Sequence, residues 1–206
     1  MTRSMFILQT VLILMVTAVA PPAIAQNLVV NPNFDTDPSG WTGPGMWDPL
    51  DVDNSPNSGS ATYINTSAGT AGFAFVRQCI TVDPTAIGYD IVARTYVPSG
   101  QAGTGFARVD LVWFTDSLCN DYLTYEEFLP PGLFDTWEQA GGPAFRPSTA
   151  QSVWVSAVNQ KFDAGNFQVY VDALSLQPHV SSTMIFGDGF DSGSQAAWSA
   201  SVPGPS

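Results

Sequence analysis

The sequence predicts an all-β fold, an antiparallel β-sandwich of about eight strands. Only 12% of the 206 residues are charged, whereas glycine (18 residues), proline (16) and aromatic residues (12%) are abundant, as is typical of short strands joined by turns. Extended segments recur at fairly regular spacing, and the period of an amphipathic helix is hard to find between them. Strands that follow one another without intervening helices favour an antiparallel sandwich over a parallel α/β sheet.

Eight segments have the composition of strands. They are Asn27–Val30, Ser60–Asn65, Gly72–Val82, Tyr89–Val97, Phe106–Phe114, Thr136–Gly141, Val153–Val158 and Phe167–Leu176. Stretches rich in glycine, proline and serine separate them. Within Phe106–Phe114, alternation places Ala107, Val109, Leu111 and Trp113 on one face, which we expect to point into the core.

The polar faces of two of these strands carry three charged side chains. Arg94 lies on one strand, and Arg108 and Asp110 lie on the other. If the two strands are neighbours, these side chains form a charged patch on one face of a sheet. One interpretation is a solvated cross-strand ion pair that stabilises the fold by less than about 1 kcal/mol. The other is a polar surface that binds a ligand.

The first 25 residues predict a cleaved signal peptide. Arg3 supplies a positive start, Phe6 to Ala20 is almost entirely apolar, and Ala23-Ile-Ala25 is a small-x-small cleavage sequence. The alternative, an uncleaved membrane anchor, needs about 20 apolar residues, and this run is shorter. No second run is long enough, so we expect no transmembrane segment after cleavage and a secreted protein, periplasmic or extracellular. The chain then divides into a signal peptide (1–25), a sandwich domain (26–178) and a linker with a C-terminal tail (179–206).

The charge of the chain argues against one class of partner, and its cysteine content predicts a disulfide. The chain has 18 acidic residues against 6 Lys and Arg, a net charge of -12, so it lacks the clustered basic residues of a nucleic-acid binder. Cys79 and Cys119 are the two cysteines, and in an exported domain two thiols usually pair. We therefore expect a disulfide that joins a strand to the end of another strand.

Both ends of the predicted domain resemble a known family. The opening Asn27-Leu-Val-Val-Asn-Pro-Asn-Phe-Asp35 with Gly40-Trp41, the Ser58-Gly-Ser-Ala61 piece, and the closing Val169-Tyr-Val-Asp-Ala-Leu-Ser-Leu176 are similar to galactose-binding-like, jelly-roll carbohydrate-binding modules of secreted bacterial proteins. The resemblance covers most of residues 26–178 and implies a jelly roll of eight or nine strands. Pro32 departs from the family, which often has glycine in this turn.

The resemblance also implies a structural calcium where the first and last strands meet, with Asp35 and Asp172 among its ligands. Calcium takes six to eight oxygen ligands, and the stretch that contains Asn31 and Asp35 is rich in side-chain oxygens. Asp172 interrupts an apolar strand on a face that alternation also gives to Tyr170 and Leu174, so its carboxylate needs a cation, an arginine or a set of backbone N–H groups. The alternative for Asn31 and Asp35 is turn capping.

Sugar-binding sites commonly contain aromatic residues, because the C–H face of a sugar ring packs on Trp or Tyr. The candidates are Trp47, Trp154, Tyr122 and Tyr125, together with the polar surface at Arg94, Arg108 and Asp110. The alternative for each aromatic residue is that it is buried and closes the sandwich edge. The function that we predict is a non-catalytic carbohydrate-binding module for a neutral glycan or polysaccharide, since the acidic surface repels acidic glycans. An adhesion or surface-structural module without a small ligand is the other hypothesis.

Catalysis has little support in the sequence. His179 is the single histidine, and no nucleophile elbow or zinc-binding helix accompanies it. Glu126 with Glu127, or Asp135 with Glu138, are the acid pairs that two-carboxylate glycoside hydrolysis would use. We expect a protein that is not an enzyme.

The tail contains Phe186-Gly-Asp-Gly-Phe-Asp-Ser-Gly193, followed by Trp198. It resembles a short ending of various secreted bacterial proteins. A sorting or envelope-retention role is one hypothesis, and an extra strand or loose terminus is the other.

Overall fold

The computed structural model describes residues 26–180, so the predicted signal peptide and the tail motif lie outside the described residues. Within this range the chain forms nine strands and no helix, and so none that could cross a membrane. The strands are β1 (Met46–Asp48), β2 (Ser60–Asn65), β3 (Gly72–Thr81), β4 (Ala86–Tyr96), β5 (Gly105–Phe114), β6 (Tyr122–Phe128), β7 (Trp137–Phe145), β8 (Ser152–Lys161) and β9 (Phe167–Val180).

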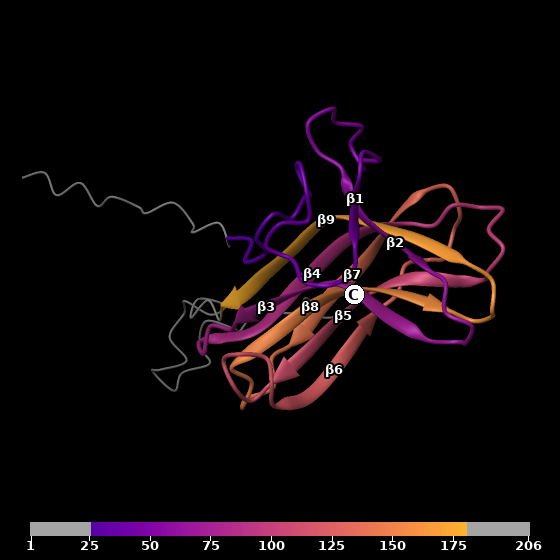
Figure 1. The fold of residues 1–206 in the computed structure, drawn as a ribbon. Coiled ribbons are helices and arrows are strands. Elements are labelled where there is room, and N and C mark those ends of the chain that lie inside the picture. The colour runs from indigo at the N-terminus through magenta and orange to yellow at the C-terminus, as the bar shows by residue number, and fades with distance from the viewer. Residues whose placement is uncertain (1–25, 181–206) are drawn as a thin grey trace, which may run out of the picture.

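The strands form two antiparallel sheets that pack face to face (Figure 1). One sheet has five strands in the order β1-β2-β9-β4-β7, and the other has four in the order β3-β8-β5-β6. This architecture confirms the predicted antiparallel jelly-roll β-sandwich.

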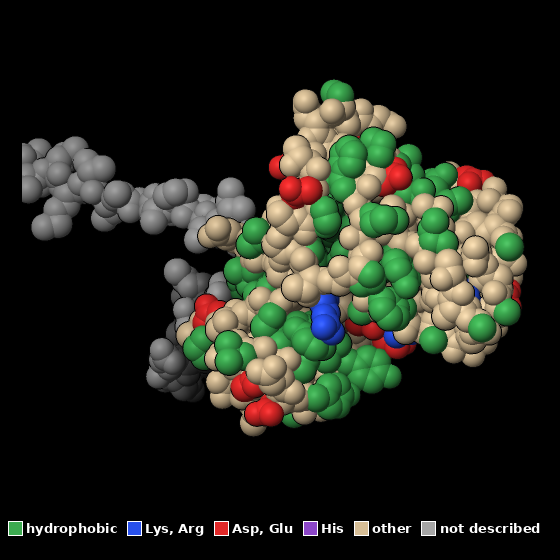
Figure 2. Space-filling model, in the orientation of Figure 1, with side chains coloured by type: hydrophobic (Ala, Val, Ile, Leu, Met, Phe, Trp, Pro, Cys, Tyr) green, Lys and Arg blue, Asp and Glu red, His purple; other side chains and the backbone are tan. Residues whose placement is uncertain are grey.

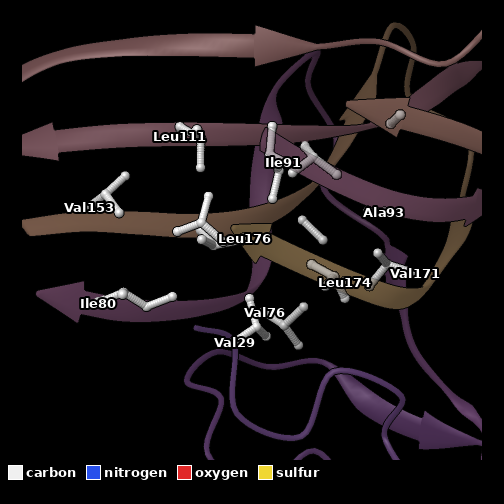
Figure 3. Close-up of a cluster of buried hydrophobic side chains, with 14 of the residues drawn as sticks. Val29, Val76, Ile80, Ile91, Ala93, Leu111, Val153, Val171, Leu174 and Leu176 are labelled. Atoms are coloured by element: carbon white, nitrogen blue, oxygen red, sulfur yellow. The ribbon is translucent and has the colours of Figure 1, made fainter. Parts of the chain in front are cut away.

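The core lies between the two sheets, because the longer strands direct apolar residues inward (Figure 3). On β5 the four residues predicted to face inward are buried, and Leu111 and Trp113 have no exposed surface. Ile91 of β4 and Val171 of β9 face them from the five-stranded sheet.

Seven of the eight predicted strands are present, with bounds that shift by a few residues. Asn27–Val30 is not a strand: it lies beside β9 beyond the end of β2, where the Leu28 N–H donates to the Leu176 carbonyl and the Asn27 side chain bonds the β9 backbone. The short strand β1 and the edge strand β6 were not predicted. Strand β9 runs to Val180, two residues past the predicted boundary of the domain.

A bulge in β9 corrects one assignment from alternation. Ala173 has a positive φ of 49°, and the pairing between β4 and β9 shifts register there. The extra residue turns Leu174 inward, where it is 1% exposed. Tyr170 and Asp172 remain on the outer side, so the prediction that Leu174 shares their face is wrong.

The predicted disulfide between Cys79 and Cys119 is present, with the two Cα atoms 6.1 Å apart. Cys79 lies on β3, and Cys119 lies in the loop between β5 and β6. Ser152 at the start of β8 holds this loop, because its hydroxyl accepts the Cys119 N–H and donates to the Asp116 carbonyl. The bridge therefore joins the loop to the far edge strand of the four-stranded sheet.

Candidate functional site

The outer face of the four-stranded sheet gathers five of the seven predicted sugar-binding residues. They are Arg108 and Asp110 on β5, Tyr122 and Tyr125 on β6, and Trp154 on β8. Cross-strand pairing sets their positions: Val112 lies opposite both Tyr125 and Trp154, and Asp110 lies opposite Glu127. We call this surface, with Arg77, Glu127 and Gln160 beside these five residues, the Trp154 face.

Arg108 is the polar centre of the Trp154 face. Its guanidinium donates to both oxygens of Asp110, at 2.9 and 3.2 Å, and to the Gln160 side chain at 3.2 Å. A further ion pair joins it to Glu127 at 3.0 Å. Arg108 and Asp110 therefore form an ion pair, but within one strand and with a buried carboxylate, whereas the sequence suggested a solvated pair across strands; the cross-strand pair is the one with Glu127. Because four side chains fix one another, the polar groups that border the aromatic residues are held in place.

Asp110 is the buried member of this network, with 7% of its surface exposed. Burial raises its pKa to about 6, against the lowering effect of the Arg108 hydrogen bonds and charge, and the nearby Glu127 raises it further. At neutral pH the carboxylate is mostly ionised and accepts from Arg108. In mildly acidic solution it becomes a neutral acid.

Trp154 points outward, whereas its neighbours Val153 and Val155 are fully buried. The guanidinium of Arg77 lies 4.1 Å from the centre of the Trp154 ring, and the Phe114 ring packs edge-on at 4.7 Å. The ring is thus fixed from two sides and is partly exposed. The alternative that it is fully buried at the sandwich edge is not what the structure shows.

Tyr122 and Tyr125 leave more surface open. They are 61% and 52% exposed, on an edge strand whose outer side has no covering element among residues 26–180. An exposed tyrosine offers an apolar ring and a hydroxyl together, which suits the mixed C–H and hydroxyl surface of a sugar.

Arg94 does not join Arg108 and Asp110. It lies on β4 of the five-stranded sheet, opposite Gln139 and Asp172, whereas β5 belongs to the other sheet. The predicted three-residue patch is wrong, because β4 and β5 follow one another in sequence but are not paired. The outer faces of the two sheets look in opposite directions.

Trp47 also lies away from the Trp154 face, on the short strand β1. It is 38% exposed, and its indole N–H donates to the Phe34 carbonyl at 2.7 Å. Its ring lines an open cavity of about 480 Å³ together with Asp35, Thr36, Pro56 and Asn57.

The three predicted calcium ligands differ in their surroundings. Asp172 is fully buried, and its two oxygens accept the backbone N–H groups of Val52 and Ala173 at 3.0 and 2.7 Å. Burial raises its pKa to about 7 in spite of these bonds. The sequence left a cation, an arginine or backbone N–H groups as partners of this carboxylate, and the structure provides backbone N–H groups.

Asn31 follows the turn-capping alternative, whereas Asp35 takes part only through its backbone N–H. The Asn31 oxygen accepts the Asp35 N–H at 3.2 Å, and the Asn31 amide group donates to the Asp37 and Ser39 carbonyls. In the part of the chain that the structure describes, no three acidic, cysteine or histidine side chains gather closely enough to hold a metal ion. Calcium, which also binds amide and backbone carbonyl oxygens, stays a prediction from the sequence.

The acid pairs considered for hydrolysis are placed for other roles. Glu126 lies opposite the core residue Leu111 and accepts the Trp113 indole N–H at 3.1 Å, whereas Glu127 points to the outer face. Glu138 is buried and accepts the N–H groups of Gly132 and Leu133. Asp135 is exposed and accepts the Ser99 N–H.

Arg77, Glu127 and Gln160 are the members of the Trp154 face that sequence reasoning missed. Each lies at an outward position of a strand, but no sequence pattern shows that β3 pairs with β8 or β5 with β6. On the side of the molecule shown in Figure 2, the few Lys and Arg side chains (blue) lie among hydrophobic (green) and acidic (red) ones and form no basic cluster.

Comparison with known proteins gives the fold. No protein-family model matches the sequence, and no curated protein matches it. An arabinose-bound GH51 α-L-arabinofuranosidase has a TM-score of 0.54 and 17% identity, covering 74% of this chain and 26% of the other. The enzymatically active domain of tailspike protein 4 of bacteriophage CBA120 has a TM-score of 0.52 and 15% identity, covering 74% and 21%.

A xylan-binding domain of CBM 22 has a TM-score of 0.47 and 16% identity, covering 77% of this chain and 97% of that domain. The chain spans only about a quarter of the length of the first two proteins. At these identities, the likeness to the arabinofuranosidase and to the tailspike domain shows a shared fold over the matched part of this chain.

Proposed function

We propose that the protein is a secreted, non-catalytic carbohydrate-binding module that binds a neutral glycan or polysaccharide on the Trp154 face. The observation that carries the proposal is the register of the outer face. Trp154 and Tyr125 lie on either side of Val112, Tyr122 lies opposite Phe114, and Asp110 and Glu127 of the Arg108 network lie two residues from Val112 and Tyr125 on the same strands. Sugar rings pack their C–H faces on the aromatic side chains, and their hydroxyls bond the polar groups between them.

A neutral ligand suits this surface because Arg108 is already paired with two carboxylates. The net charge of -12 opposes the approach of acidic glycans as well. Binding without catalysis is supported by Glu126 and Glu127, which point to opposite sides of their sheet. Secretion is supported by the sequence of the first 25 residues and by the disulfide.

Weak to moderate affinity is expected, with Kd values of roughly micromolar to millimolar, because sugar hydroxyls exchange bonds with water for bonds with the protein. The test is retention on insoluble cellulose, xylan and mannan, comparing the wild type with Trp154→Ala and Tyr125→Ala. We expect at least about tenfold weaker binding, or about 1.4 kcal/mol, for Trp154→Ala. Phe145→Ala is the matched control, since Phe145 is an aromatic residue, 81% exposed, at the far end of β7.

Unchanged retention of a folded Trp154→Ala variant would remove the Trp154 face as the site. Absence of retention on all three polysaccharides would favour the adhesion or structural module. Release of reducing ends would show that the protein is an enzyme.

A further inference from the structure

The outer face of the five-stranded sheet carries a row of three aromatic residues that the sequence analysis did not single out. Tyr96 on β4 lies directly opposite Tyr170 on β9 and Trp137 on β7. The ring centres are 5.7 Å apart for Tyr96 and Tyr170, and 5.5 Å apart for Tyr96 and Trp137. Because neighbouring strands are about 4.8 Å apart, the row extends roughly 10 Å across the sheet.

The three rings are at the surface of the sandwich. Each is partly exposed, whereas the adjacent residues Thr95 and Val171 are 2% and 0% exposed and face the core. The core therefore does not require aromatic residues at these positions. The outer face of such a sheet usually carries polar side chains, so three neighbouring rings here need another reason.

Polar side chains with free donors lie next to the row. Arg94 is two residues before Tyr96, on the same face, and is paired in register with the exposed Gln139. Within residues 26–180, the guanidinium of Arg94 and the amide of Gln139 make no hydrogen bond or ion pair with another side chain or with the backbone. Arginine offers five N–H donors, and glutamine offers two donors and an acceptor.

We propose that Tyr96, Tyr170, Trp137, Arg94 and Gln139, the Tyr96 face, form a second site for a neutral glycan, on the opposite side of the domain from the Trp154 face. The aromatic row takes the C–H faces of consecutive sugar rings. The guanidinium and the amide bond the hydroxyls along one edge of the chain. A single domain then has two binding faces and can hold two glycan chains, or two parts of one chain, at once.

The arrangement suits a glycan. Arg94 lies on the same face as the rings and makes no hydrogen bond or ion pair among residues 26–180, so its donors are available beside the apolar row. Sugars present apolar and hydroxyl surface side by side, as the two neighbouring rows do.

The experiment uses the full chain and retention on cellulose, xylan and mannan. Five variants are compared with the wild type: Trp154→Ala, Tyr96→Ala with Trp137→Ala, the combination of these three changes, Trp154→Ala with Arg94→Gln, and Phe145→Ala as the control. We expect each single-face variant to bind more weakly but still to be retained, and the combined variant to lose retention. Arg94→Gln, which leaves the rings in place, is expected to weaken the binding of the Trp154→Ala protein about tenfold.

The outcomes separate the two sites. Complete loss of retention by Trp154→Ala alone, in a folded protein, would overturn the second site and leave the first. Retention of Trp154→Ala that is unaffected by the Tyr96, Trp137 and Arg94 changes would also overturn it. If the variant with Tyr96→Ala and Trp137→Ala loses retention while Trp154→Ala is retained like the wild type, the second site is supported and the first is overturned. A dimer in sedimentation analysis that Trp137→Ala dissociates would assign the Tyr96 face to self-association and overturn the proposal.

Discussion

Asp110 makes the stability of the fold depend on pH. Its pKa is about 6 in the folded protein, compared with an ordinary value of 3.8, because burial outweighs the effect of Arg108. Between about pH 4 and 6 the folded protein therefore holds a proton that the unfolded chain has lost, and the free energy of unfolding falls as the pH rises. At about 1.36 kcal/mol per pKa unit, a move from 3.8 to about 6 is worth at most about 3 kcal/mol.

The Asp110→Asn variant removes this titration and keeps the shape of the side chain. We expect the free energy of unfolding to fall less between pH 4 and pH 7 than in the wild type, by up to about 3 kcal/mol. Asp172 also has a raised pKa, so it too makes the free energy of unfolding fall as the pH rises, in the wild type and in Asp110→Asn alike. The effect of Asp110 is therefore the difference between the two proteins in the slope of this free energy against pH. Urea unfolding followed by tryptophan fluorescence, at fixed ionic strength and several pH values, gives these slopes.

Asp51 provides the matched control, since it is 5% exposed. Burial alone would raise its pKa, but hydrogen bonds from Ser58, Ser55 and Asp53 lower it overall. Its stabilising effect is therefore lost only as the pH falls below about 4. Asp51→Asn is expected to lower stability evenly from pH 5 to 8, and parallel curves for the wild type and Asp110→Asn would refute the reasoning.

Three further predictions concern stability. Replacing both Cys79 and Cys119 with serine is expected to lower the free energy of unfolding by about 2 to 4 kcal/mol, and an unchanged urea midpoint under oxidising conditions would contradict the role of the bridge. The calcium prediction expects a higher melting midpoint with calcium than with excess chelator, and superimposable curves would remove the ion. Gly141→Ala is expected to cost about 1 to 3 kcal/mol, because Gly141 has a φ of 140° and an added Cβ would lie 2.1 Å from the Ile91 carbonyl oxygen. Gly100→Ala, with a φ of 69° and open space around it, should cost less in the same assay.

Strands with strong alternation were predictable from the sequence, and those without it were not. β5 has buried residues at alternate positions, which is the pattern that alternation detects. No residue of β6 is fully buried, because β6 is an edge strand that the opposite sheet covers only in part. Its sequence therefore lacks the contrast between inner and outer positions. β1, with three residues, is too short to show a period.

The bulge at Ala173 shows a second limit. Alternation assumes one residue per step along the strand, and an inserted residue reverses the faces of all residues that follow it. Neither a glycine nor a proline marks this position in the sequence. The burial of Leu174 and the outward side of Asp172 thus follow from the pairing with β4, which the local sequence does not encode.

For the two binding faces, the sequence predicted which side chains of a strand point outward, but not which strands lie next to one another. Alternation correctly put Trp154 opposite in direction to Val153 and Val155, and it separated Arg108 and Asp110 from the core side of β5. It could not tell that Arg94 belongs to the other sheet, because the connection from β4 to β5 passes from one sheet to the other. Inner positions are constrained by packing, whereas outer positions are free to be polar. The aromatic and arginine residues that occupy outer positions on both sheets are therefore the part of this sequence that the core does not explain, and the two proposed binding faces give them a role.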